Sequence, residues 1–191
     1  MDQTASLIRE GQVGDVKSLT FFLYCLAKFR YTSGDKEFLD RAAKVLLSEE
    51  LTIYSASRNL WNLEVLGFNP ESDDLRNDLL THLTQTILKH QTSLNEFDVA
   101  DTVKALTGLD FLDFNCLEVC LKWTLSHASE MKATSLAVIL EALVSAEVIN
   151  QTLFVKISEE IERRIGEGQE IGTDTCVKFL SAYCQAEKFE F

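Results

Sequence analysis

Five segments of this chain carry the same pattern of apolar residues, and this recurrence limits the fold more than any other feature. Each segment is centred on a leucine, called here its anchor leucine; the anchors are Leu26, Leu63, Leu106, Leu143 and Leu180. The intervals between them are 37, 43, 37 and 37 residues. Three residues before each anchor stands a second aliphatic residue: Leu23, Leu60, Val103, Leu140 and Val177. Because residues three and four apart lie on one face of an α-helix, each segment predicts a helix with one apolar face.

The regular interval predicts a stacked array of helix pairs, because a recurrence of 20–50 residues is typical of repeat proteins. We predict an all-α fold: a right-handed α-solenoid of about 4.5 helix-turn-helix repeats with a period of about 37 residues, as a single domain over residues 1–191. The first helices are expected near residues 16–30, 52–68, 96–111, 134–148 and 173–188. The six extra residues of the longest interval belong to a longer second helix after Pro70 or to the loop Lys89–Leu94.

The charge of the chain is acidic and unevenly distributed. The formal net charge is −12, and residues 1–50 contribute only −1 of it. An acidic surface repels phosphate and argues against tight non-specific binding of nucleic acid, although a local basic track stays open. Two further basic pairs, Lys28/Arg30 and Arg163-Arg164, are as easily explained by ion pairs with acids one helical turn away, for example Glu159–Arg163 and Glu160–Arg164.

The cysteine content and the hydropathy pattern limit the environment of the protein. Five cysteines, an odd number without close spacing, favour reduced thiols over a disulfide framework. No run of about 18 apolar residues is present, so no membrane-spanning segment is predicted. The first residues, MDQTASLIREGQ, include acids and lack the Arg-rich character of a transit peptide.

Two groups of candidate ligands or catalytic residues are better explained as structural. Cys116, Cys120 and His127 share a helix face, but structural zinc needs four ligands and no second pair is near, so the cysteines are expected to pack as small apolar residues. His82 and His90 have no catalytic partner in the sequence and are expected on a solvated helix face. No nucleophile elbow, phosphate-binding glycine loop or HExxH motif is present. We predict a protein that is not an enzyme and has no catalytic residue, cofactor or metal.

Three segments resemble the helical repeats of organellar RNA-metabolism proteins: DVADTVKALTGLDFLD (98–113), TLFVKISEEIERRI (152–165) and TCVKFLSAYCQAEKF (175–189). These families carry the FAST-kinase-like, RAP-associated heptatricopeptide repeats and the octotricopeptide repeats, which are related to pentatricopeptide repeats. The resemblance extends from residue 16 to residue 188. The chain departs from the octotricopeptide pattern because Pro70 is its only proline. No RAP domain is expected after the repeats, so no nuclease-like function is implied. The resemblance implies a protein of the mitochondrial matrix in RNA processing, translation or a large organellar assembly.

Equivalent positions of stacked repeats form a stripe, and the position two residues before the anchors carries aromatic and charged side chains. These are Tyr24, Trp61, Lys104, Glu141 and Lys178. Tyr24, Trp61, Lys104 and Lys178 are therefore candidate contacts for RNA or for a partner, since aromatic rings stack on bases and lysines bind phosphates. Glu141 interrupts this stripe. The alternative is that the rings are half-buried and the lysines solvate the surface.

The last residues of the sequence are aromatic. Terminal repeats normally present a polar outer face, so Tyr183, Phe189 and Phe191 are candidates for docking onto another chain. The alternative is that these rings fold back onto the last repeat.

These observations lead to a function hypothesis. We expect a non-enzymatic helical-repeat adaptor or structural subunit of a mitochondrial complex, with a ribonucleoprotein such as the mitochondrial ribosome or an RNA-processing assembly favoured. Its partners would be protein subunits of that assembly, with RNA as a further partner, and neither a small-molecule substrate nor membrane insertion is expected. The alternatives are direct binding of single-stranded RNA and a scaffold role in a respiratory or ATP synthase complex.

Overall fold

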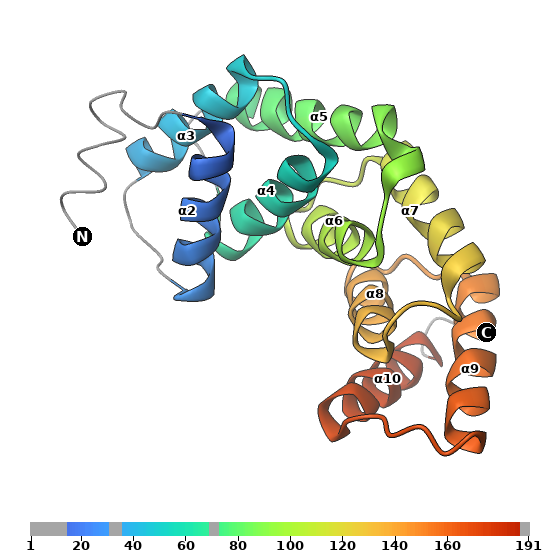
Figure 1. Cartoon of the computed structure of the whole chain (residues 1–191). Helices are drawn as coiled ribbons and strands as arrows, with labels where there is room; N and C mark the ends of the chain where they lie inside the picture. Colours follow the sequence, from blue (N-terminus) through green and yellow to red (C-terminus); the bar gives the residue numbers. More distant parts are fainter. Residues whose placement is uncertain (1–14, 31–35, 69–72, 188–191) are drawn as a thin grey trace. The chain divides into compact units, whose positions relative to one another are not determined.

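The computed structural model describes residues 15–30, 36–68 and 73–187, and within these ranges every regular element is helical. The described residues form nine α-helices and one short 3₁₀ helix, with no strand (Figure 1). The prediction of an all-α fold is therefore confirmed. None of the helices in these ranges has the length and apolar character needed to cross a membrane. The chain divides into two compact units, residues 1–93 and residues 94–191.

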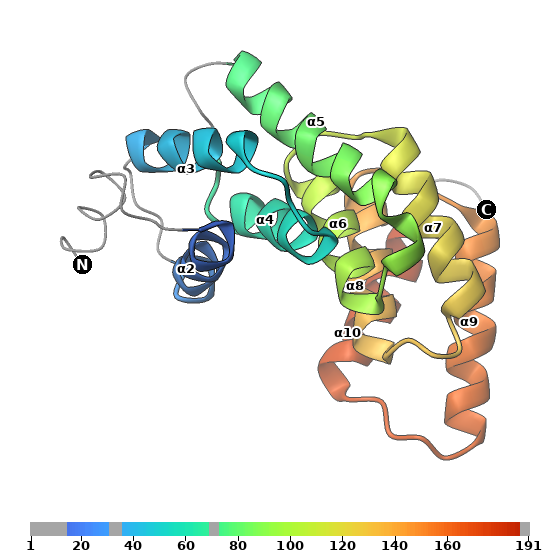
Figure 2. The same cartoon turned by 45° about the horizontal axis from the view of Figure 1, so that its top comes forward.

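The first unit pairs helices that alternate along the chain. Its described helices are α2 (Val16–Lys28), α3 (Lys36–Ser48), α4 (Ile53–Val65), α5 (Asp73–Lys89) and the 3₁₀ helix η1 (Gln91–Ser93). α2 packs on α4 and α3 packs on α5, while α4 also packs on α5 (Figures 1 and 2). Asp15 and Thr52 begin α2 and α4, because their side chains accept hydrogen bonds from backbone N–H groups three residues further on.

The second unit repeats this arrangement with different residues. Its described helices are α6 (Glu96–Gly108), α7 (Phe114–His127), α8 (Ala133–Ser145), α9 (Gln151–Gly166) and α10 (Thr173–Ala186). α8 packs on both α6 and α10, and α7 packs on α9. Asn95 begins α6 with a capping box that includes Asp98, and Asn150 begins α9 by accepting from a backbone N–H group.

The apolar face predicted from the repeats forms the core of both units. The anchors of α4, α6 and α8 have no exposed surface: Leu63, Leu106 and Leu143. The same is true of the residues three positions before them: Leu60, Val103 and Leu140. In these helices, therefore, the recurring apolar residues are the ones that pack in the core.

Four of the five first helices end in the same way, four residues after the anchor. The residue there has a positive φ in each: Arg30, Gly67, Asp110 and Glu147. In α4, α6 and α8 the next backbone N–H then donates to the anchor's carbonyl oxygen, as Phe68 does to Leu63 at 2.9 Å. This is the Schellman pattern, in which a left-handed residue closes the last turn. It ends α4, α6 and α8 three residues before the predicted boundaries.

The longest repeat interval contains the longest of the second helices, α5. α5 has 17 residues, against 13, 14 and 16 for α3, α7 and α9. η1 then occupies part of the loop Lys89–Leu94.

Candidate functional site

Five side chains of α2 and α4 form a group of three rings and two cations, called here the aromatic–cation cluster: Tyr24, Lys28, Tyr54, Arg58 and Trp61. The centroids of the Tyr24 and Trp61 rings lie 5.9 Å apart, with the ring planes inclined at 42°. The Lys28 Nζ lies 5.4 Å from the Tyr24 centroid and 5.5 Å from the Trp61 centroid. The Arg58 guanidinium carbon lies 5.1 to 5.8 Å from all three rings. Since ring faces attract cations, the cluster holds two positive charges together on the first unit.

The packing of α4 on α2 brings the cluster together. Beneath it, the Asn59 side-chain amide donates to Thr20 Oγ1 at 2.9 Å, and the Asn62 amide donates to the Thr20 carbonyl oxygen at 3.2 Å. All three residues are buried. These bonds fix the register of the two helices, so that the same repeat position of each, Tyr24 and Trp61, lies side by side.

The sequence identified two members of the cluster and missed the other three. Lys28 is one helical turn beyond Tyr24, and Arg58 lies one turn from both Tyr54 and Trp61. Spacing of three and four residues around the predicted aromatic positions was the signal that would have found them. Lys28 and Tyr54 are exposed, Tyr54 by 57%. Chemically, the cluster suits a ligand that combines flat rings with negative charge.

In the second unit the same repeat position carries charge instead of rings. Lys178 of α10 donates to Glu141 Oε2 of α8 at 2.7 Å, and both side chains are about half exposed. Lys104 of α6 is half-buried. The predicted stripe is therefore aromatic and cationic in the first unit, whereas Lys178, the last member of the stripe, is neutralised by the glutamate that interrupts it.

The predicted C-terminal docking residues are only partly described. Tyr183 faces α9, where its hydroxyl donates to the Phe154 carbonyl oxygen at 2.9 Å and accepts from Ser158 Oγ at 2.8 Å. Its ring meets the Phe154 ring edge to face at 5.5 Å. Burial raises the pKa of the Tyr183 phenol, so it stays protonated and keeps donating. Phe189 and Phe191 lie outside the described residues.

An exposed apolar surface does occur on α10, at positions that the sequence placed in the core. Val177 is 59% exposed and the anchor Leu180 is 66% exposed. Their equivalents in α4, α6 and α8 are fully buried. Sequence reasoning missed this surface because the five segments have the same pattern, and a pattern does not show whether a neighbour covers it.

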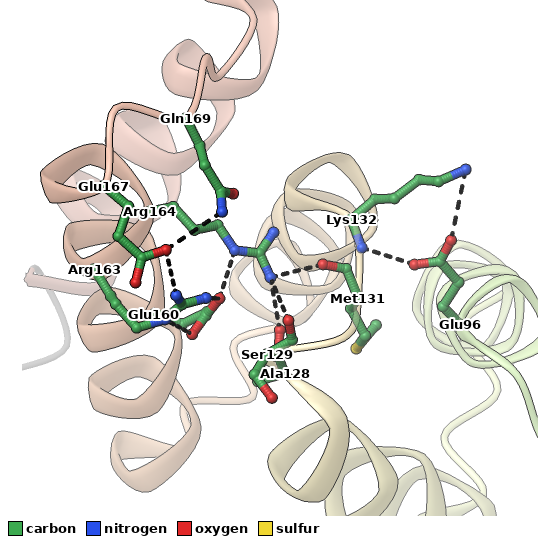
Figure 3. Close-up of polar contacts among 10 residues, drawn as sticks. All are labelled: Glu96, Ala128, Ser129, Met131, Lys132, Glu160, Arg163, Arg164, Glu167 and Gln169. Atoms are coloured by element: carbon green, nitrogen blue, oxygen red, sulfur yellow. Dashed lines mark hydrogen bonds and ion pairs between the residues drawn. The ribbon is translucent and has the colours of Figure 1, made fainter.

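A buried arginine ties α9 to the end of α7 (Figure 3). The Arg164 Nη2 donates to the carbonyl oxygens of Ala128 and Met131 at 3.0 and 2.8 Å, and to that of Ser129 at 3.3 Å. Its Nε donates to Glu160 Oε1 at 2.5 Å. These carbonyl groups belong to the C-cap residue of α7 and to the turn that follows it, so a side chain of α9 supplies hydrogen-bond donors to buried backbone groups outside the helices.

Arg163 completes the ion pairs of α9, with one change from the predicted pairing. It donates to both oxygens of Glu160, at 2.7 and 2.9 Å, and to Glu167 at 2.6 Å. The predicted Glu160–Arg164 pair is present, whereas Arg163 pairs with Glu160 and Glu167 in place of Glu159. Hydrogen bonds from Arg163 and then Arg164 lower the pKa of Glu160 to about 2, against an opposing effect of burial. The network has a structural role, because each of its charged side chains is bonded to another side chain of the network.

The candidate metal and catalytic residues lie in packed or paired surroundings. Cys116 and Cys120 are buried and free of disulfides, and a hydrogen bond with Cys116, together with burial, raises the pKa of the Cys120 thiol. His127 stacks on Trp123 with ring centroids 4.2 Å apart. His82 of α5 and His90, which follows the end of α5, are both half-buried and do not lie on a fully solvated helix face as predicted. Across the described ranges, no three His, Cys, Asp or Glu side chains are placed to hold a metal ion.

Comparisons with other proteins assign no family to this arrangement. The chain matches no protein-family model, and no curated protein matches it.

Proposed function

We propose that this protein is a non-enzymatic helical-repeat scaffold that holds other macromolecules in an assembly. The observation that carries the proposal is the packing of alternate helices, α2 on α4, α6 on α8 and α8 on α10, through recurring apolar faces. Proteins built in this way bury a row of contacts and leave long surfaces for partners. On this proposal the repeats continue as a right-handed solenoid with a period of about 37 residues.

The setting that we propose is a ribonucleoprotein of the mitochondrial matrix. The support is the resemblance of residues 98–113, 152–165 and 175–189 to organellar RNA-metabolism repeats. A role in a respiratory or ATP synthase complex is the alternative setting for the same scaffold.

Affinity purification from the native source tests the scaffold and its setting together. The bound material is divided into nuclease-treated and untreated halves, and the partners are identified by mass. Partners that survive nuclease and belong to the ribosome or to RNA processing are the expected result. Partners from a respiratory or ATP synthase complex would contradict the proposed ribonucleoprotein setting and favour the alternative one. The absence of any stable partner would contradict the proposed scaffold function.

Direct binding of single-stranded RNA is a second candidate, favoured by the aromatic–cation cluster. Its rings offer stacking faces and its two cations offer phosphate contacts, on a unit whose formal charge is only −3 of the total −12. Lys28 is the cation to change, since it is exposed and lies over Tyr24 and Trp61.

The RNA candidate is tested with a fluorescent 15-nucleotide single strand and the full chain. Lys28→Glu is expected to weaken binding about tenfold or more, because it replaces a phosphate contact with repulsion. Lys122→Glu is the matched control, since Lys122 is also exposed but lies on α7 beside Glu118. Equal affinities of the wild type and both variants would rule out the cluster as the RNA site.

A further inference from the structure

One face of α10 is apolar in the middle and acidic at both ends. Val177 and Leu180 form its centre, and Asp174, Cys184 and Glu187 continue it at intervals of three or four residues, all five exposed. Residues at this spacing lie along one side of a helix. We call these five residues the α10 face.

The chain's own packing indicates what kind of element covers such a face. In α4, α6 and α8 the residues equivalent to Val177 and Leu180 have no exposed surface, and each of these helices packs on helices of its own unit. α10 packs chiefly on α8, and no described helix covers Val177 and Leu180. A helix is therefore the element that fits the α10 face, with apolar residues at intervals of three and four.

The charges around the face indicate the composition of that helix. Asp174 and Glu187 flank the apolar centre, and Lys178 nearby is neutralised by Glu141. Glu187 also stands at the C-terminal end of α10, where the helix dipole is negative. Residues 94–191 contain 17 acidic and 8 basic residues, a formal charge of −9. Opposite charge steers association and selects partners.

We propose that the α10 face binds a basic amphipathic helix of a partner protein. Apolar side chains of that helix cover Val177 and Leu180, and its lysines or arginines pair with Asp174 and Glu187. The inference rests on the proposed scaffold function and names the class of partner that one surface of the scaffold takes. A single helix buries less than about 1,200 Å² in total, so the contact is weak and salt-dependent unless further surfaces join it.

Photo-crosslinking identifies the segment that covers the face. The photoreactive amino acid p-benzoylphenylalanine is placed at position 177 of the full chain in its native source, and the crosslinked peptide is sequenced. The expected peptide comes from another protein, has apolar residues at i, i+3 or i+4 and i+7, and carries a net positive charge. A crosslink to a second copy of this chain, to nucleic acid, or to an acidic or unpatterned segment would overturn the proposal, as would the absence of a crosslink.

Charge insertion then tests whether the face is needed for binding. Val177→Glu with Leu180→Glu is expected to reduce recovery of the crosslinked partner at least tenfold, with unchanged helicity and thermal midpoint because both side chains are exposed. Val155→Glu is the matched control, since Val155 is the same residue type, is 56% exposed and lies on α9. If partners are recovered equally with the wild type and both variants, the docking inference fails and the scaffold stands. If the wild type recovers no partner, the scaffold itself fails.

Discussion

The two units hold neighbouring helices together through buried polar groups that differ in charge. In the first unit the amides of Asn59 and Asn62 on α4 bond to Thr20 on α2, and no charge is involved. In the second unit the guanidinium of Arg164 on α9 bonds to carbonyl oxygens that follow α7, and Glu160 balances its charge. In both units the bonds between different helices join residues more than 30 positions apart in the sequence.

Helices that pack in similar ways are thus joined by two kinds of buried polar contact, one neutral and one charged. The two kinds differ in the free energy of unfolding that is lost when they are removed. A buried neutral hydrogen bond contributes modestly, and its loss costs the desolvation of the group left behind. A buried ion pair contributes little net stability. Removing one member of the pair lowers the stability strongly, because the remaining buried charge and the carbonyl groups are left without a partner. The two units are therefore expected to respond differently to mutation and to pH.

The largest expected effect is that of Arg164→Met. The substitution keeps most of the apolar stem but removes the bonds to Ala128 and Met131 and one partner of Glu160. Loss of one member of a buried pair costs 3–5 kcal/mol; because Arg163 stays with Glu160, we expect about 3 kcal/mol. The chain has two tryptophans, Trp61 and Trp123, one in each unit. Denaturant unfolding followed by Trp123 fluorescence in a Trp61→Phe background measures this loss in the second unit.

Arg163→Met is the control for this prediction. Arg163 pairs with Glu160 and Glu167 but is 45% exposed and contacts no carbonyl of the α7 end. Its pair with Glu167 is exposed and worth about 0–1 kcal/mol, and the buried Glu160 keeps Arg164 as a partner, so the loss should be smaller than for Arg164→Met. Equal losses for the two arginines would show that the hydrogen bonds of Arg164 to the carbonyl groups after α7 do not stabilise the unit.

Acid is expected to weaken the Glu160–Arg164 contacts in the second unit and to leave the hydrogen bonds between Thr20 and the two asparagines in the first unit unchanged. The pKa of Glu160 is about 2 in the folded chain, below its ordinary value of 4.5. A lowered pKa stabilises the fold above pH 4.5, and this contribution is lost as the pH falls from 4.5 to 2. The midpoint of unfolding reported by Trp123 should fall across this window, and Glu160→Gln should flatten the fall.

Glu50→Gln separates this effect from general acid sensitivity. A hydrogen bond from Lys89 lowers the pKa of Glu50 in the first unit, but Glu50 is highly exposed. Its replacement should leave the pH dependence reported by Trp61 almost unchanged. If Glu50→Gln and Glu160→Gln flattened their curves equally, the hydrogen bonds of the two arginines to Glu160 would not be the cause.

The neutral hydrogen bonds between α2 and α4 in the first unit are tested by Thr20→Val. Valine has nearly the shape of threonine but cannot accept the bond from Asn59, so a buried amide loses a partner. The expected cost is about 1–2 kcal/mol, measured by Trp61 fluorescence in a Trp123→Phe background, and it should not change between pH 2 and 4.5. Thr20→Ser keeps the hydroxyl and should lose less; a larger loss for serine would mean that the methyl group, and not the hydrogen bond, matters.

The sequence predicted the helices well because their signals are local. Apolar spacing defined the faces, and residues such as Asn95 and Asn150 cap the helices that follow them. The helix ends were predicted three residues late in α4, α6 and α8. Of the residues that close these helices, Gly67 carries a strong sequence signal for positive φ, Asp110 a weaker one and Glu147 none.

The candidate sites were harder to predict because they depend on contacts between distant residues. The stripe hypothesis found Tyr24 and Trp61, since equivalent positions meet when alternate helices pack. Spacing of three and four residues around the aromatic positions would have added Arg58, and the meeting of equivalent positions would have paired Lys178 with Glu141, but the hypothesis placed these residues in a stripe without pairing them. Likewise, local spacing predicted the Glu160–Arg164 pair but not the carbonyl groups that Arg164 binds.

The smallest expected effects concern the helix ends, where the units again differ. Gly67 closes α4 with φ +67°, and a Cβ added there would meet nothing within 4 Å. Glu147 closes α8 at φ 57° in the second unit. An L-residue in the left-handed region costs about 1–2 kcal/mol. Gly67→Ala should therefore destabilise the first unit by about 1 kcal/mol. Glu147→Gly removes the backbone strain at position 147 and should stabilise the second unit by up to about 1 kcal/mol. Part of this gain is offset because glycine makes the unfolded chain more flexible. Thermal unfolding with each tryptophan as reporter gives both signs. If Glu147→Gly lowered the stability, the Glu147 side chain would have to contribute more than the backbone strain costs, and closure of these helices would depend on side chains as well as on φ.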